Sequence, residues 1–315
     1  TNGKIGRRLN YEMPGATSLI KKTARALRKL KEPPYKQALL ETHKGWGDVN
    51  IWKLIKREYG ATTAMYYLAA ADARFDPEGN VAWQEEQRQI YLKLFGRTLV
   101  MSLGITLMCI LLGYPIAYLL ATLPVRTSNL LMILVLLPFW TSLLVRTTSW
   151  IALLQQEGVL NDIFVWLGFV ADDDRIRLIH NKTGTVIAMT HILLPFMVLP
   201  LYSVMKTIPP SYMRAARSLG ANPLVAFVRI YLPNTVAGVG AGSILVFILA
   251  IGYYITPALV GGETGTFISN FIADHISTTL NWGLGAALGV MLLSIVLALY
   301  FVYDRIVGID NMKLG

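Results

Sequence analysis

From residue 97 onward, long stretches without charge alternate with short charged connections. An α-helix needs about 20 predominantly apolar residues to cross the ~30 Å of hydrocarbon in a bilayer. Four uncharged stretches exceed this length, and the longest lies between Arg229 and Glu263. The pattern predicts four membrane-spanning helices, over residues 97–122, 183–206, 235–260 and 283–303.

A fifth apolar stretch, residues 128–154, contains one charge, Arg146, near one end. A long arginine side chain near the end of a span can extend its guanidinium group to the headgroups and so avoid the centre of the hydrocarbon. We therefore expect a fifth membrane helix over 128–154, with Arg146 reaching toward the membrane surface.

The remaining segments are more polar. Residues 1–96 are expected to form a mostly helical, water-facing region with Asp48 as a candidate helix cap and Gly60 as a candidate helix stop. The apolar face of that helix follows a helical spacing and comprises Val49, Trp52, Ile55 and Tyr59. Residues 155–181 are expected to lie at the membrane interface, and residues 261–281 to form a loop.

These elements predict an all-α, polytopic membrane protein with five visible membrane helices. Composition agrees, because 54% of the 315 residues are hydrophobic and 15% are charged, which is unusual for a soluble domain. We divide the chain into a helical accessory region, residues 1–96, a transmembrane region, residues 97–308, and a tail, residues 309–315. Because the first residue is Thr1 rather than Met, we expect a sixth helix to be missing upstream.

The formal net charge is +10, and it is unevenly distributed. Residues 1–96 hold 17 Lys and Arg against 10 Asp and Glu, whereas residues 97–315 hold 12 against 9. No nucleic-acid-binding motif accompanies this charge, so we interpret it as a surface beside anionic membrane lipid and expect no nucleic acid partner. The single cysteine, Cys109, excludes an intrachain disulfide or a cysteine metal site.

Orientation follows from the basic residues, because Lys and Arg in short loops stay in the cytoplasm. Arg126 lies in the first turn, Lys206 and Arg229 flank the connection between the helices 183–206 and 235–260, and Lys313 lies in the tail. We expect these three regions to face the cytoplasm. Residues 1–96 then lie on the extracytoplasmic side, since large domains translocate largely regardless of charge.

The connection between the second and third uncharged stretches, "PPSYMRAARSLGANPLVAFVRIYLP", spans residues 209–233 and holds three arginines and no carboxylate. We call it the elbow. Two prolines end the preceding helix, Ser211 is a candidate cap for a short helix, and Gly220 is a candidate left-handed stop. Asn222 is expected to cap a second short helix that ends before Pro233.

The first short helix of the elbow has the composition of a docking surface. Ala215 and Ala216 have small side chains, which permit a partner to approach the helix closely. Arg214 and Arg217 stand three residues apart on a shared flank and supply directional hydrogen bonds.

The spacing Ala215-Ala216, three residues, Gly220, nine residues, Ile230-x-Leu232-Pro233 resembles the cytoplasmic "EAA" loop of permease subunits in binding-protein-dependent ABC importers. Arg214 stands where that family has a glutamate. The stretches "LPFWTSLLVRTTSW" (137–150), "HILLPFMVLPLYSVMKTI" (191–208) and "YYITPALVGG" (253–262) are similar to the spermidine/putrescine-type permeases in particular, and the resemblance covers roughly residues 90–308.

The resemblance implies a type I importer permease fold in the bacterial inner membrane. It also implies two cytoplasmic ATPase subunits that bind ATP and Mg²⁺, a second and different permease subunit, and an extracytoplasmic solute-binding protein. The chain contains no G-x-x-x-x-G-K-[ST] loop, so it is expected to hold no cofactor and to depend on a partner for energy. The elbow residues that the resemblance assigns to ATPase coupling are Arg214, Ala215, Ala216, Arg217, Gly220, Ile230, Leu232 and Pro233.

The substrate path is less clearly marked. Trp140, Thr141, Tyr253 and Tyr254 lie in predicted membrane helices, where an aromatic ring can stack on a cationic solute. Asp274 is a candidate to attract a polyamine at the outer mouth. The four uncharged helices contain no Asp or Glu, so a path for a cation here is lined by aromatic rings or carbonyls, or uses carboxylates of a partner.

Two other classes of protein are considered. A proton- or ion-coupled carrier or channel usually needs ionisable groups inside the membrane, and only Arg146 and His191 are candidates. A membrane enzyme is disfavoured because the four histidines are scattered along the chain, and because the run "ADDDR" at 171–175 is typical of a solvated loop. Neither class gives the elbow a role.

Overall fold

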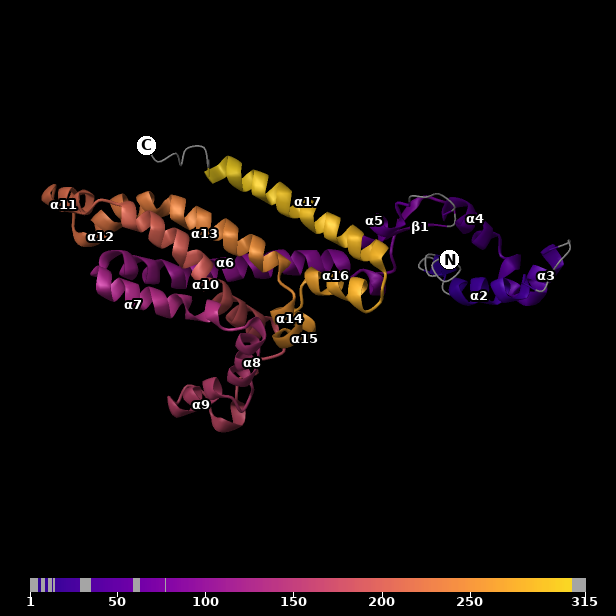
Figure 1. Ribbon diagram of the computed structural model, residues 1–315, viewed down its shortest axis with the longest axis horizontal. Helices are drawn as coiled ribbons and strands as arrows, with labels where there is room; N and C mark the ends of the chain where they lie inside the picture. The colour runs from indigo at the N-terminus through magenta and orange to yellow at the C-terminus, as the bar shows by residue number, and fades with distance from the viewer. Residues whose placement is uncertain are drawn as a thin grey trace. The chain divides into compact units, whose positions relative to one another are not determined.

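The computed structural model describes residues 5–6, 9–10, 13, 15–28, 35–58, 63–76 and 78–307. It divides the chain into two compact units, residues 1–92 and 93–315, whose elements are labelled in Figure 1. The predicted helix stop at Gly60, the apolar position Tyr59 and the predicted tail 309–315 lie outside the described residues.

The first unit consists of short helices and one small hairpin. Its elements are α2 (Ala16–Ala26), α3 (Tyr35–Thr42), η1 (Lys44–Gly47), α4 (Val49–Glu58), α5 (Met65–Ala70), β1 (Ala73–Phe75), β2 (Val81–Trp83) and η2 (Glu86–Arg88). The two strands pair antiparallel, with Arg74 opposite Ala82. The hairpin is a β element that the sequence pattern did not predict, within a unit that is otherwise helical as expected.

Helix α4 begins as predicted but buries a different face. The Asp48 carboxylate accepts a hydrogen bond from the Asn50 amide at 2.9 Å and so caps the helix. The predicted apolar face is wrong at Val49 and Trp52, which are exposed whereas Ile51 and Leu54 are buried, and is confirmed at Ile55, which packs against the core. Trp52 instead lies on Trp46, with ring centroids 4.9 Å apart, and an aromatic ring can pack this way while half exposed.

Asp72 closes the junction between the hairpin and the helix that follows it. The residue is 1% exposed and has a left-handed backbone, with φ at 54°. Its carboxylate accepts hydrogen bonds from the amides of Ile90 (3.1 Å), Tyr91 (3.0 Å) and Leu92 (2.8 Å). Amides in the first turn of a helix have no acceptor within the helix. The buried carboxylate of Asp72 therefore supplies the acceptors for the amides at the start of α6.

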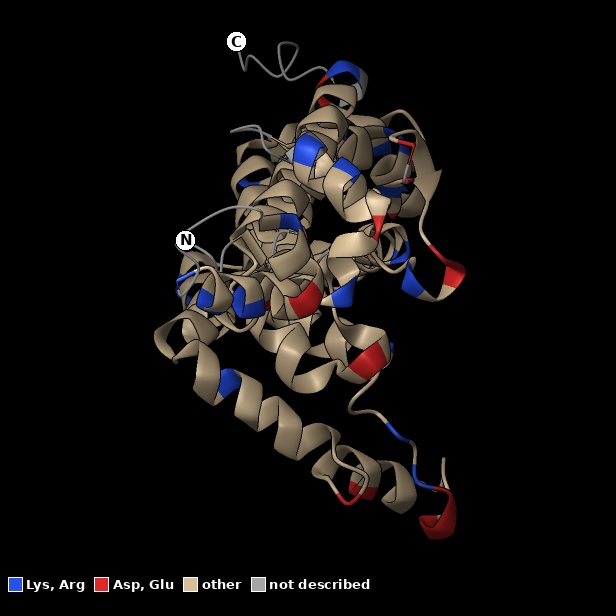
Figure 2. Ribbon diagram, turned by 90° about the vertical axis from the view of Figure 1, so that its right-hand side faces the viewer, with Lys and Arg blue, Asp and Glu red and all other residues tan. Residues whose placement is uncertain are grey.

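The second unit contains the membrane helices. Four helices are long and apolar enough to span a bilayer, and a bent pair raises the number to five, in agreement with the predicted class. The four are α6 (Tyr91–Thr122), α10 (Lys182–Thr207), α13 (Leu232–Gly252) and α17 (Trp282–Val307). Figure 1 shows α10 and α13 side by side, and in Figure 2 most of the ribbon is tan because charged residues are few.

The predicted helix 128–154 is wrong in one respect, because the structure breaks it in two. Helix α7 (Val125–Leu136) leads into the turn η3 (Leu137–Trp140), and α8 (Leu143–Leu154) follows at an angle of 98°. Pro138 lies in the turn, and proline disfavours a continuous helix. The Ser142 hydroxyl then accepts a hydrogen bond from the Val145 amide at 3.2 Å and caps the new helix.

The predicted helix 235–260 is also interrupted. Helix α13 ends at Gly252, Tyr253 is extended, and the short helix α14 (Ile255–Val260) begins with Pro257 in its first turn. The carbonyls freed at this break are paired, since Ser269 donates to the Tyr253 oxygen at 2.6 Å and Asn270 to the Tyr254 oxygen at 2.8 Å. Both donors lie in the predicted loop 261–281, which contains helices α15 (Gly262–Gly265) and α16 (Ile268–Ser277).

Helices α10 and α13 pack closely because two glycines of α13 face α10. A Cβ atom at Gly238 would lie 3.2 Å from the Cα atom of Leu201, and one at Gly242 would lie 2.6 Å from the sulfur of Met197. A Cβ atom at Gly113 of α6 would lie 3.0 Å from Cγ of the same methionine. Small residues permit such approach where lipid gives no hydrophobic drive for association, so Met197 lies between two helices that each present a glycine.

We expect Gly238→Val to weaken the α10–α13 contact. The new side chain meets backbone atoms of α10, and overpacking of this kind costs about 1–3 kcal/mol. The melting temperature of the purified protein in detergent should fall by several degrees. Gly104→Val in α6 is the matched control, because nothing lies within 4 Å of a Cβ atom there; equal losses in the two variants would show that helix propensity, not packing, is the cause.

We expect Asp72→Ala to free the first turn of α6. Removal of the carboxylate leaves three amides unpaired, and a lost helix cap costs about 0.5–2 kcal/mol. Hydrogen exchange measured by mass spectrometry should accelerate at residues 90–92. Glu78→Ala, at an exposed position of the same unit, should leave exchange unchanged, and protection at 90–92 that survives in Asp72→Ala would contradict the assignment.

Candidate functional site

The first arm of the elbow is the short helix α11 (Pro210–Ser218), and a tight corner follows it. The predicted cap, Ser211, is wrong, because Pro209 is the capping position and no side chain bonds there. The predicted stop is confirmed, because Gly220 has φ at 88°. At the corner the Gly220 amide donates to the Arg217 carbonyl at 3.0 Å and the Ala221 amide to the Ala216 carbonyl at 3.1 Å, which ends the helix with its carbonyls paired.

The second arm is continuous with the membrane helix. Asn222 accepts a hydrogen bond from the Val225 amide at 2.8 Å, as predicted for a cap. Helix α12 (Pro223–Ala226) then passes through a π-turn (Phe227–Tyr231) directly into α13. The predicted end before Pro233 is therefore wrong, since the π-turn accommodates a proline that lacks the amide an α-helix needs there.

The outer face of the elbow combines the predicted residues with an apolar patch. Arg214, Ala215, Arg217 and Gly220 are exposed, Ala216 and Ile230 are half-buried, and Leu232 and Pro233 are exposed. Two leucines beside the corner are also open, Leu219 at 89% and Leu224 at 71%. Sequence reasoning missed these leucines, although their place on either side of Gly220 in a polar connection was a usable signal.

The arginines of the elbow are available to a partner. Within the part of the chain that the structure describes, neither Arg214 nor Arg217 forms an ion pair. Helix α11 contains no acidic residue. Two free guanidinium groups on one exposed helix are suited to bind carboxylates or carbonyls of another protein.

Aromatic contacts fix the second arm of the elbow to α6. The Tyr118 ring lies edge-on to Phe227 and to Tyr231, with centroid distances of 5.6 and 5.3 Å. One turn away, the hydroxyls of Tyr114 and Thr235 are 3.1 Å apart. Met213 of the first arm also packs against the core cluster. The elbow is thus held on its inner side and open on its outer side.

The predicted path residues lie at the two helix breaks. Trp140 is 87% exposed and Thr141 donates to the Pro138 carbonyl at 2.9 Å, both at the break before α8. Tyr253 and Tyr254 form the break before α14. The hydroxyls of Thr147 and Thr256, 3.2 Å apart and buried, join α8 to α14. The structure therefore brings together the two segments that follow the breaks.

Asp274 lies apart from these four residues, on α16. Its side chain is exposed, and its backbone carbonyl accepts hydrogen bonds from the amides of Thr278 and Thr279. Burial lowers the pKa of the neighbouring His275, against the opposing charge of Asp274. Because His275 is then uncharged at neutral pH, the negative charge of Asp274 is not cancelled by it.

Arg146 is half-buried in α8, and its expected reach to the membrane surface stays a prediction. Its Nε atom is buried and has no hydrogen-bond partner among the described residues. One turn further along α8, Trp150 donates to the Nδ1 atom of His191 at 3.1 Å. Arg146 itself lies in the first turn of α8, directly after the break.

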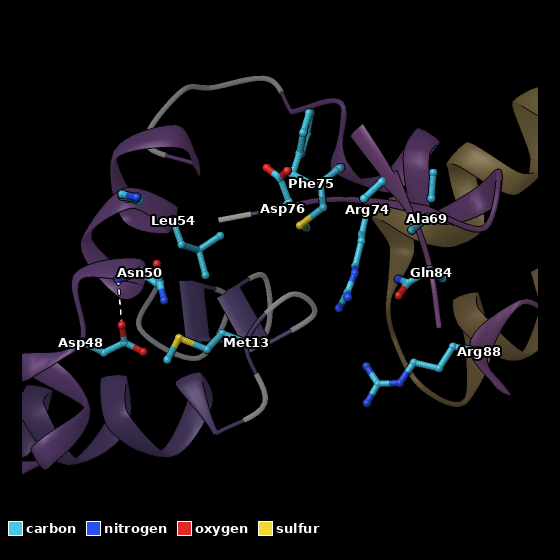
Figure 3. Close-up of a pocket in the computed structure, with 14 residues that line it drawn as sticks. Met13, Asp48, Asn50, Leu54, Ala69, Arg74, Phe75, Asp76, Gln84 and Arg88 are labelled. Carbon is cyan, nitrogen blue, oxygen red and sulfur yellow. Dashed lines mark hydrogen bonds between the residues drawn. The ribbon is translucent and has the colours of Figure 1, made fainter. Parts of the chain in front are cut away.

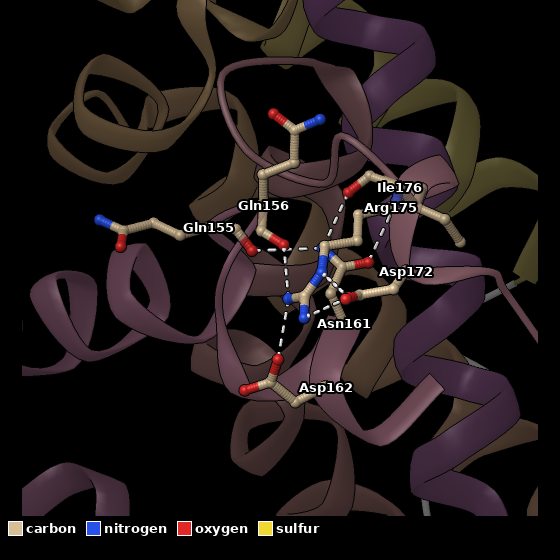
Figure 4. A network of polar contacts seen from close by, with 7 residues as sticks. All are labelled: Gln155, Gln156, Asn161, Asp162, Asp172, Arg175 and Ile176. Atoms are coloured by element: carbon tan, nitrogen blue, oxygen red, sulfur yellow. Dashed lines mark hydrogen bonds and ion pairs between the residues drawn. The ribbon is translucent and has the colours of Figure 1, made fainter. Parts of the chain in front are cut away.

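The predicted interfacial segment is folded around one arginine (Figure 4). Arg175 binds the carboxylates of Asp162 and Asp172 at 2.8 Å and donates to the Gln156 carbonyl at 3.2 Å. These hydrogen bonds raise the pKa of Arg175. Asp162 belongs to α9 (Val159–Trp166), so Asp162 and Asp172 together fix the loop that holds Arg175.

The first unit contains a cavity of about 360 Å³ with mixed polar and apolar walls (Figure 3). Arg74, Gln84 and Arg88 line one part, and Asp48 and Asn50 line another. None of these belongs to the predicted path. Among the described residues there is also no group of His, Cys, Asp and Glu that could hold a metal ion.

Comparison with known proteins agrees with this geometry. Residues 109–309 match the family model described as "Binding-protein-dependent transport system inner membrane component". The chain is 37% identical to the spermidine/putrescine transport system permease protein PotB of Escherichia coli (strain K12), over 71% of this chain and 81% of that protein. It is 34% identical to PotB of Haemophilus influenzae, over 71% and 78%.

A solved structure shares the fold. It is the crystal structure of a bacterial ABC transporter involved in the import of the acidic polysaccharide alginate, with a TM-score of 0.57 and 20% identity over 73% of this chain and 81% of that chain. The chain therefore belongs to the inner membrane components of binding-protein-dependent transport systems: it is a multi-pass permease subunit of an ABC importer, which works with an ATPase and a binding protein and carries no ATPase site or cofactor of its own.

Proposed function

We propose that this permease forms half of a solute path with a second, different permease subunit, and that two cytoplasmic ATPase subunits drive it through the elbow. The observation that carries the proposal is the outer face of α11 and its corner. There, free arginines, small residues and the exposed side chains of Leu219 and Leu224 lie together. An apolar patch rimmed by charge is typical of a protein interaction site.

The elbow can transmit motion because its two arms are extensions of membrane helices. Its first arm follows α10 directly, and its second arm continues into α13 through the π-turn. The contacts of Tyr118 hold the second arm against α6. A movement imposed on the elbow by nucleotide-driven closure of the ATPases should tilt α10 and α13 as one body and switch access to the path.

The proposed solute is a polyamine or a related small organic molecule. Support comes from the similarity to the PotB proteins, whose names specify spermidine and putrescine. Trp140, Thr141, Tyr253 and Tyr254 line the proposed path at the helix breaks, since irregular backbone within a membrane occurs where it is buried in protein or faces a water-filled cavity. The negative charge of Asp274, which His275 does not cancel, attracts the cation at the outer mouth.

The proposed placement follows the positive-inside rule. The elbow and the tail, residues 309–315, face the cytoplasm, whereas the N-terminal region, residues 1–96, is extracytoplasmic. In that position the N-terminal region can dock the solute-binding protein or shield the outer mouth.

We expect Ala215→Trp to uncouple transport while the protein still reaches the membrane. The residue is exposed, so the change leaves the fold intact but adds bulk where the ATPase is proposed to bind. Uptake of labelled putrescine and spermidine into proteoliposomes containing the whole importer should fall at least tenfold, and less ATPase should co-purify.

Ala171→Trp is the matched control, because Ala171 is also exposed but lies in the interfacial segment. It should import at the wild-type rate. Normal uptake by Ala215→Trp would refute the role of the elbow, whereas ATP-driven uptake of another solute but not of polyamines would refute only the proposed substrate.

A further inference from the structure

Four exposed apolar side chains lie at the junction between the β1–β2 hairpin and membrane helix α6. Val81 and Trp83 of strand β2 are 62% and 67% exposed. Ile90 and Leu92, beside the first residue of α6, are 40% and 45% exposed. Exposed apolar groups that lie together mark sites of interaction with another protein or with a membrane. The transport path proposed above gives none of these four residues a role.

Asp72 holds the base of the hairpin against the first residues of α6. Its carboxylate accepts the amides of residues 90–92 at 2.8–3.1 Å. Its backbone carbonyl accepts the amide of Gln84, the residue after Trp83, at 2.9 Å. Because Asp72 is buried and bonded on both sides, Trp83 is fixed close to the point at which α6 begins.

This junction lies close to the surface of the membrane. Helix α6 is continuous from Tyr91 to Thr122 and is apolar enough to span a bilayer, and Arg97 is its last charged residue. Tyr91 precedes Arg97 by six residues, which is about 9 Å at 1.5 Å per residue. One headgroup layer is about 5–8 Å thick, so the base of the hairpin is at the height of the lipid headgroups. This height is the same for either orientation of the chain.

Tryptophan is well suited to this height. Val81 and Trp83 project from the same face of the hairpin, because side chains two residues apart on a strand share a face. Tryptophan is enriched where membrane meets water, since its ring is apolar and its N–H group is polar. The hairpin therefore presents an apolar pair that matches the interfacial layer.

The backbone of β2 limits how deeply the hairpin can enter. Residues 72 and 84 are joined by a backbone hydrogen bond, as are residues 76 and 80, and hydrogen-bonded pairs alternate along an antiparallel ladder. The intervening residues 81 and 83 therefore direct their amides and carbonyls away from β1. An open strand edge does not occur in hydrocarbon, so the side chains can enter the headgroup layer while the backbone stays hydrated.

We propose that Val81 and Trp83 are a membrane anchor, which inserts into the headgroup layer of the leaflet in which α6 begins and holds the hairpin on the lipid surface. The charges nearby balance, since residues 84–93 contain two acidic and two basic side chains. The affinity therefore comes from the apolar side chains and does not require anionic lipid. The inference depends on α6 crossing the membrane and not on the solute or the ATPases.

The test is the accessibility of a spin label at Val81→Cys in the assembled importer in lipid nanodiscs. Val49→Cys on α4 is the matched control, because Val49 is 65% exposed in the same unit, and the native Cys109 is buried. Power saturation of the electron paramagnetic resonance signal compares collisions with oxygen, which concentrates in lipid, and with a water-soluble nickel chelate. The label at 81 should show several-fold lower access to nickel than the label at 49, with equal or higher access to oxygen. Trp83→Ser should move the label at 81 toward water.

Three results would overturn the proposal. Equal access to nickel at positions 81 and 49 would show that the hairpin has no preference for lipid. Low access to both reagents at position 81 would show that a protein subunit covers the hairpin. A label at 81 that is unchanged by Trp83→Ser would remove the tryptophan from the anchor. None of these measurements depends on transport, so failure of the proposed function is detected separately by the uptake assay.

Discussion

The close contact between α10 and α13 is the constraint on which the transmembrane unit depends. Glycines at 238 and 242 let the backbone of α13 approach Leu201 and Met197 of α10. The two helices form an antiparallel pair, and the elbow connects their ends. Because the contact fixes the distance between the two helices, it also fixes the distance between the two arms of the elbow. The corner at Gly220 then closes that gap with a single left-handed residue.

The helix breaks obey a second constraint, which is that every backbone polar group within the membrane needs a partner. Ser142 pairs an amide at the start of α8, and Ser269 and Asn270 pair the carbonyls freed at Tyr253 and Tyr254. Side chains of neighbouring segments thus stabilise irregular backbone that would otherwise be costly. The breaks also contain Trp140, Tyr253 and Tyr254, and Thr147 and Thr256 join the segments that follow them, so the irregular geometry and the proposed path have a common origin.

The elements that could be predicted are those marked by a property of many consecutive residues, such as the absence of charge. Uncharged stretches are sufficient to locate α6, α10, α13 and α17, and the glycine and asparagine of the elbow are sufficient to locate its corner. The breaks were missed because residues 137–142 and 253–257 carry no charge, like the helices that flank them. Pro138, Ser142 and Pro257 were the local signals, and prolines alone do not distinguish a break from a kink, since α10 passes through Pro195 and Pro200 as one helix.

Interactions between distant segments could not be predicted from the chain. The cap that Asp72 forms on residues 90–92 depends on the hairpin between them, which the sequence pattern did not predict. The bend of 98° between residues 125–140 and 143–166 is likewise not specified by side-chain composition. The exposure of Leu219 and Leu224 could be recognised only from the structure, which shows that the side chains on both sides of the corner are exposed.

The account requires that α10, the elbow and α13 move as one body, and a distance measurement tests this most directly. Spin labels at Thr183→Cys, at the start of α10, and Ser218→Cys, at the end of α11, are both exposed, while the native Cys109 is buried. Double electron–electron resonance on the assembled importer should give one narrow distance distribution that is the same without nucleotide and with ATP and Mg²⁺. A shifted or broadened distribution with ATP would show that the elbow bends relative to α10 and would contradict the account.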